Sequence, residues 1–296
     1  MNPGLYPDMP LAEYLAIKAL SSGMCFTILS QCPIEAWIDS PWNPKREQSQ
    51  GDVADIGTYA HACLLEGGTD KLFAIDPNDY PAKNGNIPVG WGNKSIRAAR
   101  DLARGEGLLP VLKDNVDAVK AMVDVAMDYI AHSDYAGVFE TGASEQTVVW
   151  DENGVLCKAR PDRLTDNGCI HYKTTKRSVR PETFERVVIS SGYDVSLAFY
   201  SRGIQRGHHL ILAQQQWGSY ACKWFGLSNA QSDISARKVE RALAIWAACI
   251  KAGKFPAYSG EVHYIEPTPW DMAKAEHDMV ESEQFSEKEL SDGIPL

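Results

Sequence analysis

The sequence lacks long apolar runs, paired cysteines and a leader-like start. No stretch of eighteen consecutive apolar residues occurs, so we expect no transmembrane helix and no membrane partner. Residues 1–10 lack the basic and apolar regions of a signal peptide, which favours a soluble, cytoplasmic protein. The seven cysteines form no CxxC pair, so the pattern favours reduced, packed thiols over a zinc or iron–sulfur site.

No stretch rich in proline, glycine or serine divides the chain, which predicts one domain over residues 1–270. With 296 residues, of which 44% are hydrophobic, the chain can bury a sizeable core. The net charge of -10 is uneven: residues 271–296 hold eight acidic and two basic residues, a net of -6. We expect this acidic tail to be solvated and partly disordered.

The spacing of apolar residues predicts an α/β chain with a largely mixed sheet. Two Asn-Gly steps, at residues 153–154 and 167–168, separate short runs rich in β-formers, which predicts three antiparallel strands. Helices are expected at residues 56–65, 94–104, 114–130, 195–203 and 234–252. Strands are expected at residues 146–150, 155–160, 168–173, 208–216 and 220–225.

Two of these strands carry the residues with chemical potential. We expect Arg160-Pro161-Asp162 on one strand of a hairpin and His171-Tyr172-Lys173 on the next. Residues 171 and 173 project from the same face, and a hairpin partner can bring Asp162 to that face as well. An acid, a second ligand and a lysine that converge can hold a divalent cation and stabilise charge on a phosphate.

The spacing of these residues resembles a known signature. Pro161-Asp162, an eight-residue gap and the run x-Tyr172-Lys173-Thr174-Thr175, in which x is residue 171, resemble the PD-(D/E)xK nuclease motif, in the form found in RecE-type phage exonucleases (exonuclease VIII). Three further segments resemble that family in the same order, namely residues 57–66, 144–150 and 254–270. The resemblance implies a restriction-endonuclease-like core, with a central mixed β-sheet flanked by helices.

The resemblance also implies roles for single residues. His61, Asp162 and His171 would be metal ligands for Mg²⁺ or Mn²⁺, and Lys173 the catalytic lysine, with Glu145 and Tyr200 as further members of the site. Each has an ordinary structural interpretation when taken alone: a packed helix histidine, a turn aspartate, a solvated lysine. Residues 157–180 carry a net charge of +5, and this stretch could bind a polyanion. The expected DNA contacts there are Arg160, Arg163, Lys176, Arg177 and Arg180.

By resemblance, the activity would be an exodeoxyribonuclease that digests linear duplex DNA from a 5′ end. The resemblance further implies a ring-like homo-oligomer, a trimer or tetramer, that works in phage recombination beside a single-strand-annealing recombinase. A RecB-like or CRISPR-associated nuclease with an iron–sulfur cluster would need clustered cysteines, which the sequence lacks.

Two positions depart from the family pattern. His171 stands where Asp or Glu is usual, so the site loses one negative charge and one oxygen ligand. Magnesium prefers oxygen, whereas manganese or another transition ion accepts an imidazole. Ser196 stands where a Gln is usual, four residues before Tyr200. Two interpretations remain: a working nuclease with an altered metal preference, or a catalytically degenerate module that binds DNA or a partner.

Overall fold

A computed structural model describes residues 1–46, 56–66, 68–82 and 84–292. The chain divides into a compact unit, Met1–Ala257, and a second unit, Tyr258–Leu296. A domain boundary at residue 270 stays a prediction. In the described parts of the chain, no helix has both the length and the apolar character that a membrane span needs. All seven cysteines are free, as expected.

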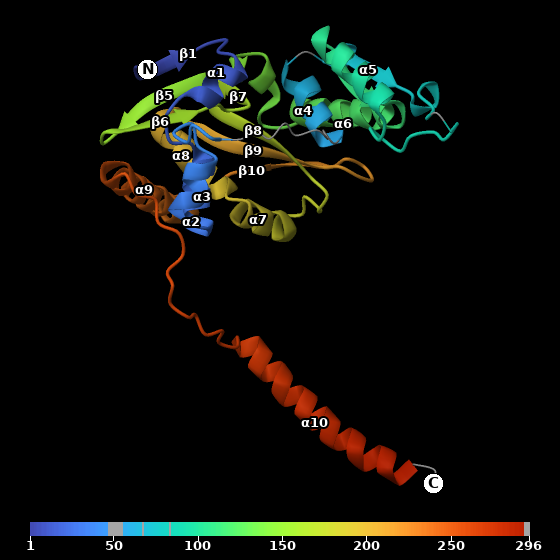
Figure 1. The fold of residues 1–296 in the computed structure, drawn as a ribbon, viewed down its shortest axis with the longest axis vertical. Coiled ribbons are helices and arrows are strands. Elements are labelled where there is room, and N and C mark those ends of the chain that lie inside the picture. Colours follow the sequence, from blue (N-terminus) through green and yellow to red (C-terminus); the bar gives the residue numbers. More distant parts are fainter. Residues whose placement is uncertain (47–55, 67, 83, 293–296) are drawn as a thin grey trace. The chain divides into compact units, whose positions relative to one another are not determined.

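The main sheet of the compact unit is mixed, as predicted, and has five strands in the order β10–β9–β8–β7–β4 (Figure 1). Its strands are β4 (Ala143–Ser144), β7 (Arg163–Thr165), β8 (Gly168–Thr175), β9 (His208–Gln215) and β10 (Cys222–Phe225). Only β8 and β9 pair in parallel. Because a parallel pair needs a crossover, the chain makes two helices between them, α7 (Pro181–Ser190) and α8 (Tyr193–Gly203).

A second sheet is formed by β1 (Gly4–Tyr6), β5 (Thr147–Glu152) and β6 (Val155–Ala159). The predicted Asn153-Gly154 turn joins β5 and β6, and both turn residues have positive φ. The predicted three-stranded pairing is wrong, because β8 pairs with β7, a three-residue strand that the sequence pattern did not reveal. Arg160, Pro161 and Asp162 consequently lie outside any strand, in the link that leads from the second sheet to the main one.

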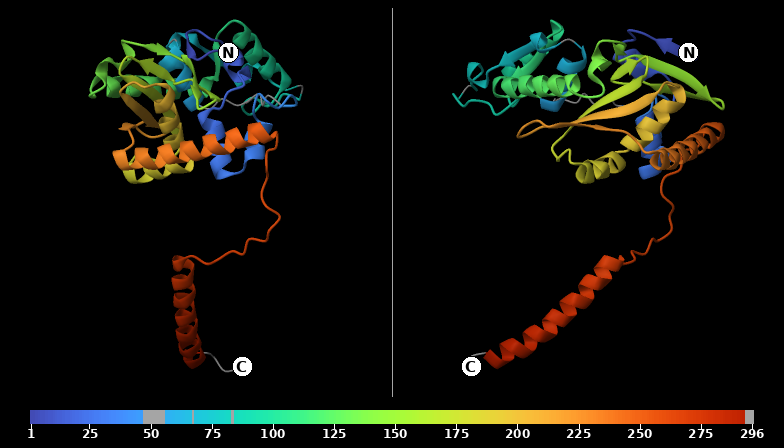
Figure 2. Two further views of the ribbon diagram at one scale, coloured as in Figure 1. Left: turned by 90° about the vertical axis from the view of Figure 1, so that its left-hand side faces the viewer. Right: turned by 180° about the vertical axis from the view of Figure 1, so that it is seen from behind.

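Alternate residues of β8 and β9 face two groups of helices on opposite sides of the main sheet (Figures 1 and 2). Tyr172 and Leu212 pack against α4 (Ile56–Glu66) and α6 (Lys113–Ala131). Ile211 and Ala213 pack against side chains of α7 and α8. Strands β2 (Leu72–Ile75) and β3 (Leu109–Leu112) form a small parallel sheet. The remaining helices of this part of the chain are α5 (Lys94–Gly105) and the short helices η1 (Thr69–Lys71), η2 (Pro77–Asp79) and η3 (Ala136–Phe139).

A further core lies between β6 and four helices. These helices are α2 (Ser22–Ser30), α3 (Pro33–Ile38), α8 and α9 (Asn229–Ala252). Helix α1 (Leu11–Ala16) contributes Tyr14 to a separate small cluster around Val149 of β5. Ser21 caps α2, because its hydroxyl accepts a hydrogen bond from the Met24 amide at 3.4 Å. Trp246 of α9 is fully buried in this core. The arrangement fixes the N-terminal end of α2 beside α8.

The second unit contains one helix, α10 (Pro269–Asp292). Residues 271–292 of the acidic tail lie within this helix, and the expectation that the tail is partly disordered stays a prediction. Side chains from Tyr258 to Val280 are exposed, as expected of a solvated segment.

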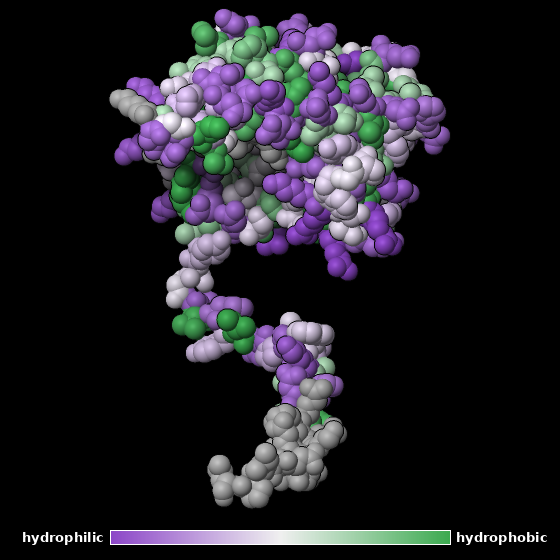
Figure 3. Space-filling view, turned by 90° about the vertical axis from the view of Figure 1, so that its right-hand side faces the viewer, coloured by the Kyte–Doolittle hydropathy of each residue, from purple (hydrophilic) through white to green (hydrophobic). Residues whose placement is uncertain are grey.

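On the face of the compact unit seen in Figure 3, hydrophobic residues are scattered among hydrophilic ones.

Candidate active site

Three elements bring polar groups to the Asp162 carboxylate. Its Oδ2 accepts hydrogen bonds from the backbone amide of Tyr172 at 2.7 Å and from the Lys173 ammonium at 3.0 Å. The Nε2 of His61 lies 3.3 Å from the same oxygen. Helix α4, strand β8 and the link before β7 thus converge on one carboxylate oxygen. The structure brings together three of the residues that the sequence indicated, although the predicted hairpin does not hold Asp162.

Electrostatics keeps Asp162 ionised in this setting. Burial disfavours the charged form, but the Lys173 ammonium and the hydrogen bond with His61 outweigh it. The pKa of Asp162 therefore lies well below its ordinary value. The side chain is 11% exposed, so the carboxylate is a nearly buried anion held by its donors.

Helix α4 presents His61 because it approaches β8 closely. Gly57 lies one turn before His61, and a Cβ at this position would collide with the side chain of Thr174. The imidazole of His61 stacks on the Tyr172 ring, with 5.9 Å between centroids. The absence of a side chain at Gly57 thus sets the depth at which His61 enters the site.

Glu145 faces the same region from the segment that follows β4. Its backbone has φ of 54°, which is unusual for a residue with a side chain, and its amide donates to the Asp162 carbonyl at 3.3 Å. Its carboxylate accepts a hydrogen bond from Arg160 Nε at 2.7 Å. Burial raises the pKa of Glu145, against the lowering effect of Arg160. Glu145 is therefore held next to Asp162 by both main chain and side chain.

One acidic residue that was not predicted from the sequence, Glu66, also lies at the site. Ligand atoms of His61, Glu66 and Glu145 lie within 4.8 Å of one another. Glu66 is the last residue of α4, and it also ends the segment 57–66 that resembles the nuclease family. Its place in that segment was the one available signal, because a glutamate at the end of a helix is usually solvated.

The donor set suits a divalent metal. Asp162, Glu145 and Glu66 supply carboxylates and His61 supplies an imidazole, the ligand types that Mg²⁺, Mn²⁺ and related ions use. Lys173 pairs with Asp162 and Arg160 pairs with Glu145, while Glu66 adds a third, exposed carboxylate, so added positive charge is favourable. The residues present therefore fit a divalent ion.

His171 lines a cavity next to this group. The cavity has a volume of about 240 Å³ and is also lined by Asp162, Lys173 and Tyr200. The Tyr200 ring lies against the His171 ring at 4.7 Å, and its hydroxyl donates to the Arg160 carbonyl at 3.4 Å. Burial lowers the pKa of His171 to about 3, so its imidazole is neutral at physiological pH.

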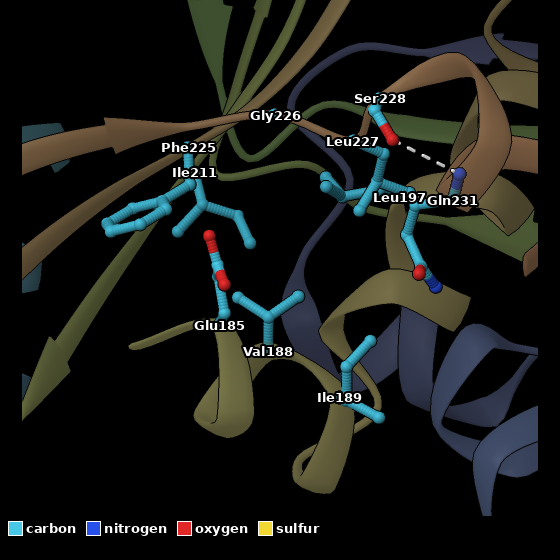
Figure 4. A pocket seen from close by; sticks show the side chains of 10 residues that line it. All are labelled: Glu185, Val188, Ile189, Leu197, Ile211, Phe225, Gly226, Leu227, Ser228 and Gln231. Carbon is cyan, nitrogen blue, oxygen red and sulfur yellow. Dashed lines mark hydrogen bonds between the residues drawn. The ribbon is translucent and has the colours of Figure 1, made fainter. Parts of the chain in front are cut away.

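Both departures from the family pattern meet in this cavity, since Ser196 lines it as well. Serine is shorter than the glutamine usual at this position, and it presents a hydroxyl group to the cavity in place of an amide. The remaining lining residues are Ser22, Ser191, Tyr193, Leu197 and Ile211. Leu197 and Ile211 also line a second, mostly apolar cavity of about 370 Å³ beneath α7 (Figure 4).

Two of the predicted DNA contacts are used inside the fold instead. Arg160 donates to Glu145, to the Met9 carbonyl at 2.7 Å and to the Thr147 hydroxyl at 3.1 Å. Arg163 donates at 2.9 Å to each of two carbonyls, those of Phe139 and Thr141, and at 3.2 Å to the hydroxyl of Ser144. Their guanidinium groups hold the segment around Glu145. The sequence did not indicate this, because charge alone does not show whether an arginine faces solvent.

The other three basic residues lie at the surface. Lys176 and Arg177 are exposed directly after β8, the strand that carries Lys173. Arg180 is also exposed and lies 3.6 Å from the carboxylate of Glu182. A DNA-binding role for these residues stays a prediction.

The mixed sheet with helices on both faces, and the lysine beside the Pro-Asp carboxylate, define a PD-(D/E)xK-like domain. The chain belongs to the family described as "PDDEXK-like domain of unknown function (DUF3799)", whose model matches residues 25–268. The superfamily prediction is thereby confirmed.

One solved structure shares this fold. A crystal structure described as a "Putative exonuclease", from Eubacterium rectale, is similar with a TM-score of 0.54 and 10% identity. The match covers 91% of this chain and 98% of that one, and at this identity it shows a shared fold. The crystal structure of SSO0001 gives a TM-score of 0.26 and 11% identity over 50% of this chain and 70% of that chain. Among curated proteins, no sequence matches the chain.

Proposed function

We propose that the chain is a metal-dependent DNA exonuclease of the RecE type, which hydrolyses phosphodiester bonds in linear duplex DNA. The observation that carries the proposal is the convergence of His61, Lys173 and the Tyr172 amide on one oxygen of Asp162. The Eubacterium rectale protein of similar fold, a "Putative exonuclease", supports the same activity.

The residues of the site divide the work of hydrolysis. Asp162, Glu145 and Glu66 supply carboxylates for a divalent ion, and His61 adds an imidazole. When bound, such an ion polarises the phosphate and lowers the pKa of a water molecule. The Lys173 ammonium, held by Asp162, stabilises negative charge on the phosphate as the water attacks. Arg160 keeps Glu145 in place.

The finer features of the proposal come from the resemblance to RecE-type enzymes. The enzyme would digest from a 5′ end, act as a ring-like trimer or tetramer in the cytoplasm, and supply single strands to an annealing recombinase during phage recombination. Lys176, Arg177 and Arg180 lie after the strand that carries Lys173, where they would contact the DNA backbone.

A second candidate function is supported by one specific observation. His171 is buried and neutral, so the position that usually holds an acid contributes no charge. Ser196 likewise replaces the usual glutamine at the cavity wall. On this alternative, the chain is a catalytically degenerate PD-(D/E)xK protein that binds DNA or a partner.

The deciding experiment is digestion of end-labelled linear duplex DNA by the purified chain with Mg²⁺, Mn²⁺ or EDTA. Lys173→Ala serves as the inactive variant, and Lys223→Ala, at an exposed lysine of β10, as the matched control. The proposal expects metal-dependent release of nucleotides by the wild type and the control alone, with closed circular DNA left intact.

Other outcomes select the alternative. Binding of DNA without cleavage in either metal would establish the degenerate module. In that case, cleavage should appear only after His171→Asp and Ser196→Gln are combined. Cleavage of closed circles would instead refute the exonuclease assignment while retaining a nuclease.

A further inference from the structure

Three side chains form a row on one face of the main sheet, leading away from the metal-binding group. Cys169 and His171 are two residues apart on β8, so they project from the same face. His209 lies on β9 directly opposite Cys169 in the parallel register. The Sγ of Cys169 lies 2.9 Å from Nδ1 of His209 and 3.6 Å from Nε2 of His171.

The far end of the row fixes the direction of its hydrogen bonds. Nε2 of His209 lies 3.1 Å from the Ile204 carbonyl, which can only accept. Nε2 of His209 therefore carries a hydrogen. Burial lowers the pKa of His209, so the imidazole is neutral and its Nδ1 has a lone pair.

The thiol transmits this direction to His171. A thiol ordinarily carries its hydrogen at neutral pH, so the sulfur of Cys169 has one hydrogen to donate. That single hydrogen is donated to Nδ1 of His209, the nearer of the two nitrogens. The sulfur is then left as an acceptor, and the nitrogen that faces it, Nε2 of His171, must be the donor.

We propose that Cys169 and His209 are positioning residues that hold neutral His171 as its Nε2–H tautomer, which leaves Nδ1 as its metal-binding nitrogen. The proposal rests on the metal-dependent function proposed above and names what selects the ion. A fixed imidazole lone pair in place of a carboxylate favours Mn²⁺ or another transition ion over Mg²⁺. Cys169 and His209 thus orient His171 through a hydrogen bond to its second ring nitrogen, as is usual for metal-binding histidines.

The tautomer can be measured without metal, DNA or activity. In metal-free protein labelled with ¹⁵N in histidine, long-range ¹H–¹⁵N spectra distinguish the two ring nitrogens of each residue. We expect both His171 and His209 to carry hydrogen on Nε2 at neutral pH. A spectrum with hydrogen on Nδ1 of His171, or with a charged ring, would overturn the proposal whether or not any variant folds.

Variants then test whether the sulfur sets the tautomer. Cys169→Ala leaves Nε2–H of His171 without an acceptor, so we expect a mixed tautomer and Mn²⁺ affinity lower by about tenfold or more. Cys169→Ser keeps a group that donates and accepts and should restore both readouts. Cys222→Ala, at a half-buried cysteine outside the row, is the matched control.

The outcomes separate this proposal from the proposed function. An unchanged His171 spectrum and unchanged Mn²⁺ affinity in Cys169→Ala would refute the positioning role. A wild type with the expected tautomer and Mn²⁺ binding, but without DNA cleavage, would refute the nuclease and leave the positioning role standing.

Discussion

Replacement of Lys173 by methionine removes the ammonium that holds Asp162 and keeps a side chain of similar length. The two charges are 3.0 Å apart, which gives an attraction of about 5 kcal/mol at an effective dielectric constant near 20. The lysine side chain is 28% exposed, so solvent screens part of this attraction. The Tyr172 amide and His61 also remain as partners of the carboxylate. We therefore expect the free energy of unfolding of Lys173→Met at pH 7 to be about 3 kcal/mol lower than that of the wild type. This value is at the low end for a buried ion pair that has lost one partner.

The pH dependence gives this expectation a sign. The folded wild type holds the pKa of Asp162 below its unfolded value, so its stabilising contribution is complete above that unfolded value and is lost only as pH falls through the folded pKa. Without the ammonium, burial raises the pKa of Asp162 in the folded variant. The folded variant therefore takes up a proton at Asp162 as pH falls from 7 to 4. The difference in free energy of unfolding between the variant and the wild type becomes smaller as a result.

The assay is urea unfolding with EDTA at pH 7 and at pH 4, followed by circular dichroism. Lys223→Met, at an exposed lysine of β10, controls for the loss of a surface charge and should change stability little. Equal stability of Lys173→Met and wild type at pH 7 would refute the electrostatic reasoning. An equal deficit at both pH values would show that packing, and not the charge on Asp162, is responsible.

Three further perturbations test other contacts of the site. His171→Asp adds an oxygen ligand and should tighten Mg²⁺ binding about tenfold, or ~1.4 kcal/mol, in calorimetric titration; an unchanged affinity would exclude this position from the metal site. Gly57→Ala places a methyl group against Thr174, and thermal or urea unfolding should show a loss of about 1–3 kcal/mol, in contrast to full stability if α4 can shift freely. Arg160→Ala leaves the half-buried Glu145 without the guanidinium that lowers its pKa, so the pKa of Glu145 should rise further. Its Mn²⁺ affinity should then fall more steeply than that of the wild type between pH 7 and pH 5, and parallel pH profiles would contradict this role.

Periodicity predicted the long helices well, because α4, α6 and α9 each bury one apolar stripe. It failed where pairing is non-local or the element is short. Strand β7 has three residues, too few for an alternating pattern, and the register of β8 with β9 joins residues forty positions apart. The sequence therefore indicated that residues 155–160 pair with β8, whereas β7 takes that place in the hairpin.

The candidate site shows the same division. The order of motifs indicated His61, Asp162 and Lys173, and the structure brings their side chains together. Charge alone misdirected the reasoning at Arg160, whose guanidinium serves Glu145, because burial depends on tertiary packing. Glu66 was missed for the converse reason, since a helix-terminal acid carries no local sign of its neighbours.

The parallel pairing of β8 with β9 has a consequence for the order of events during folding. The pair can form only after the intervening chain, including α7 and α8, has been made and has crossed over. Strand β8 carries Lys173, and His61 comes from a helix about a hundred residues earlier in the chain. A nascent chain that ends before β9 therefore has all the polar groups around Asp162 but lacks the parallel partner of β8. The group of residues around Asp162 would then be completed late, together with other long-range contacts of the fold.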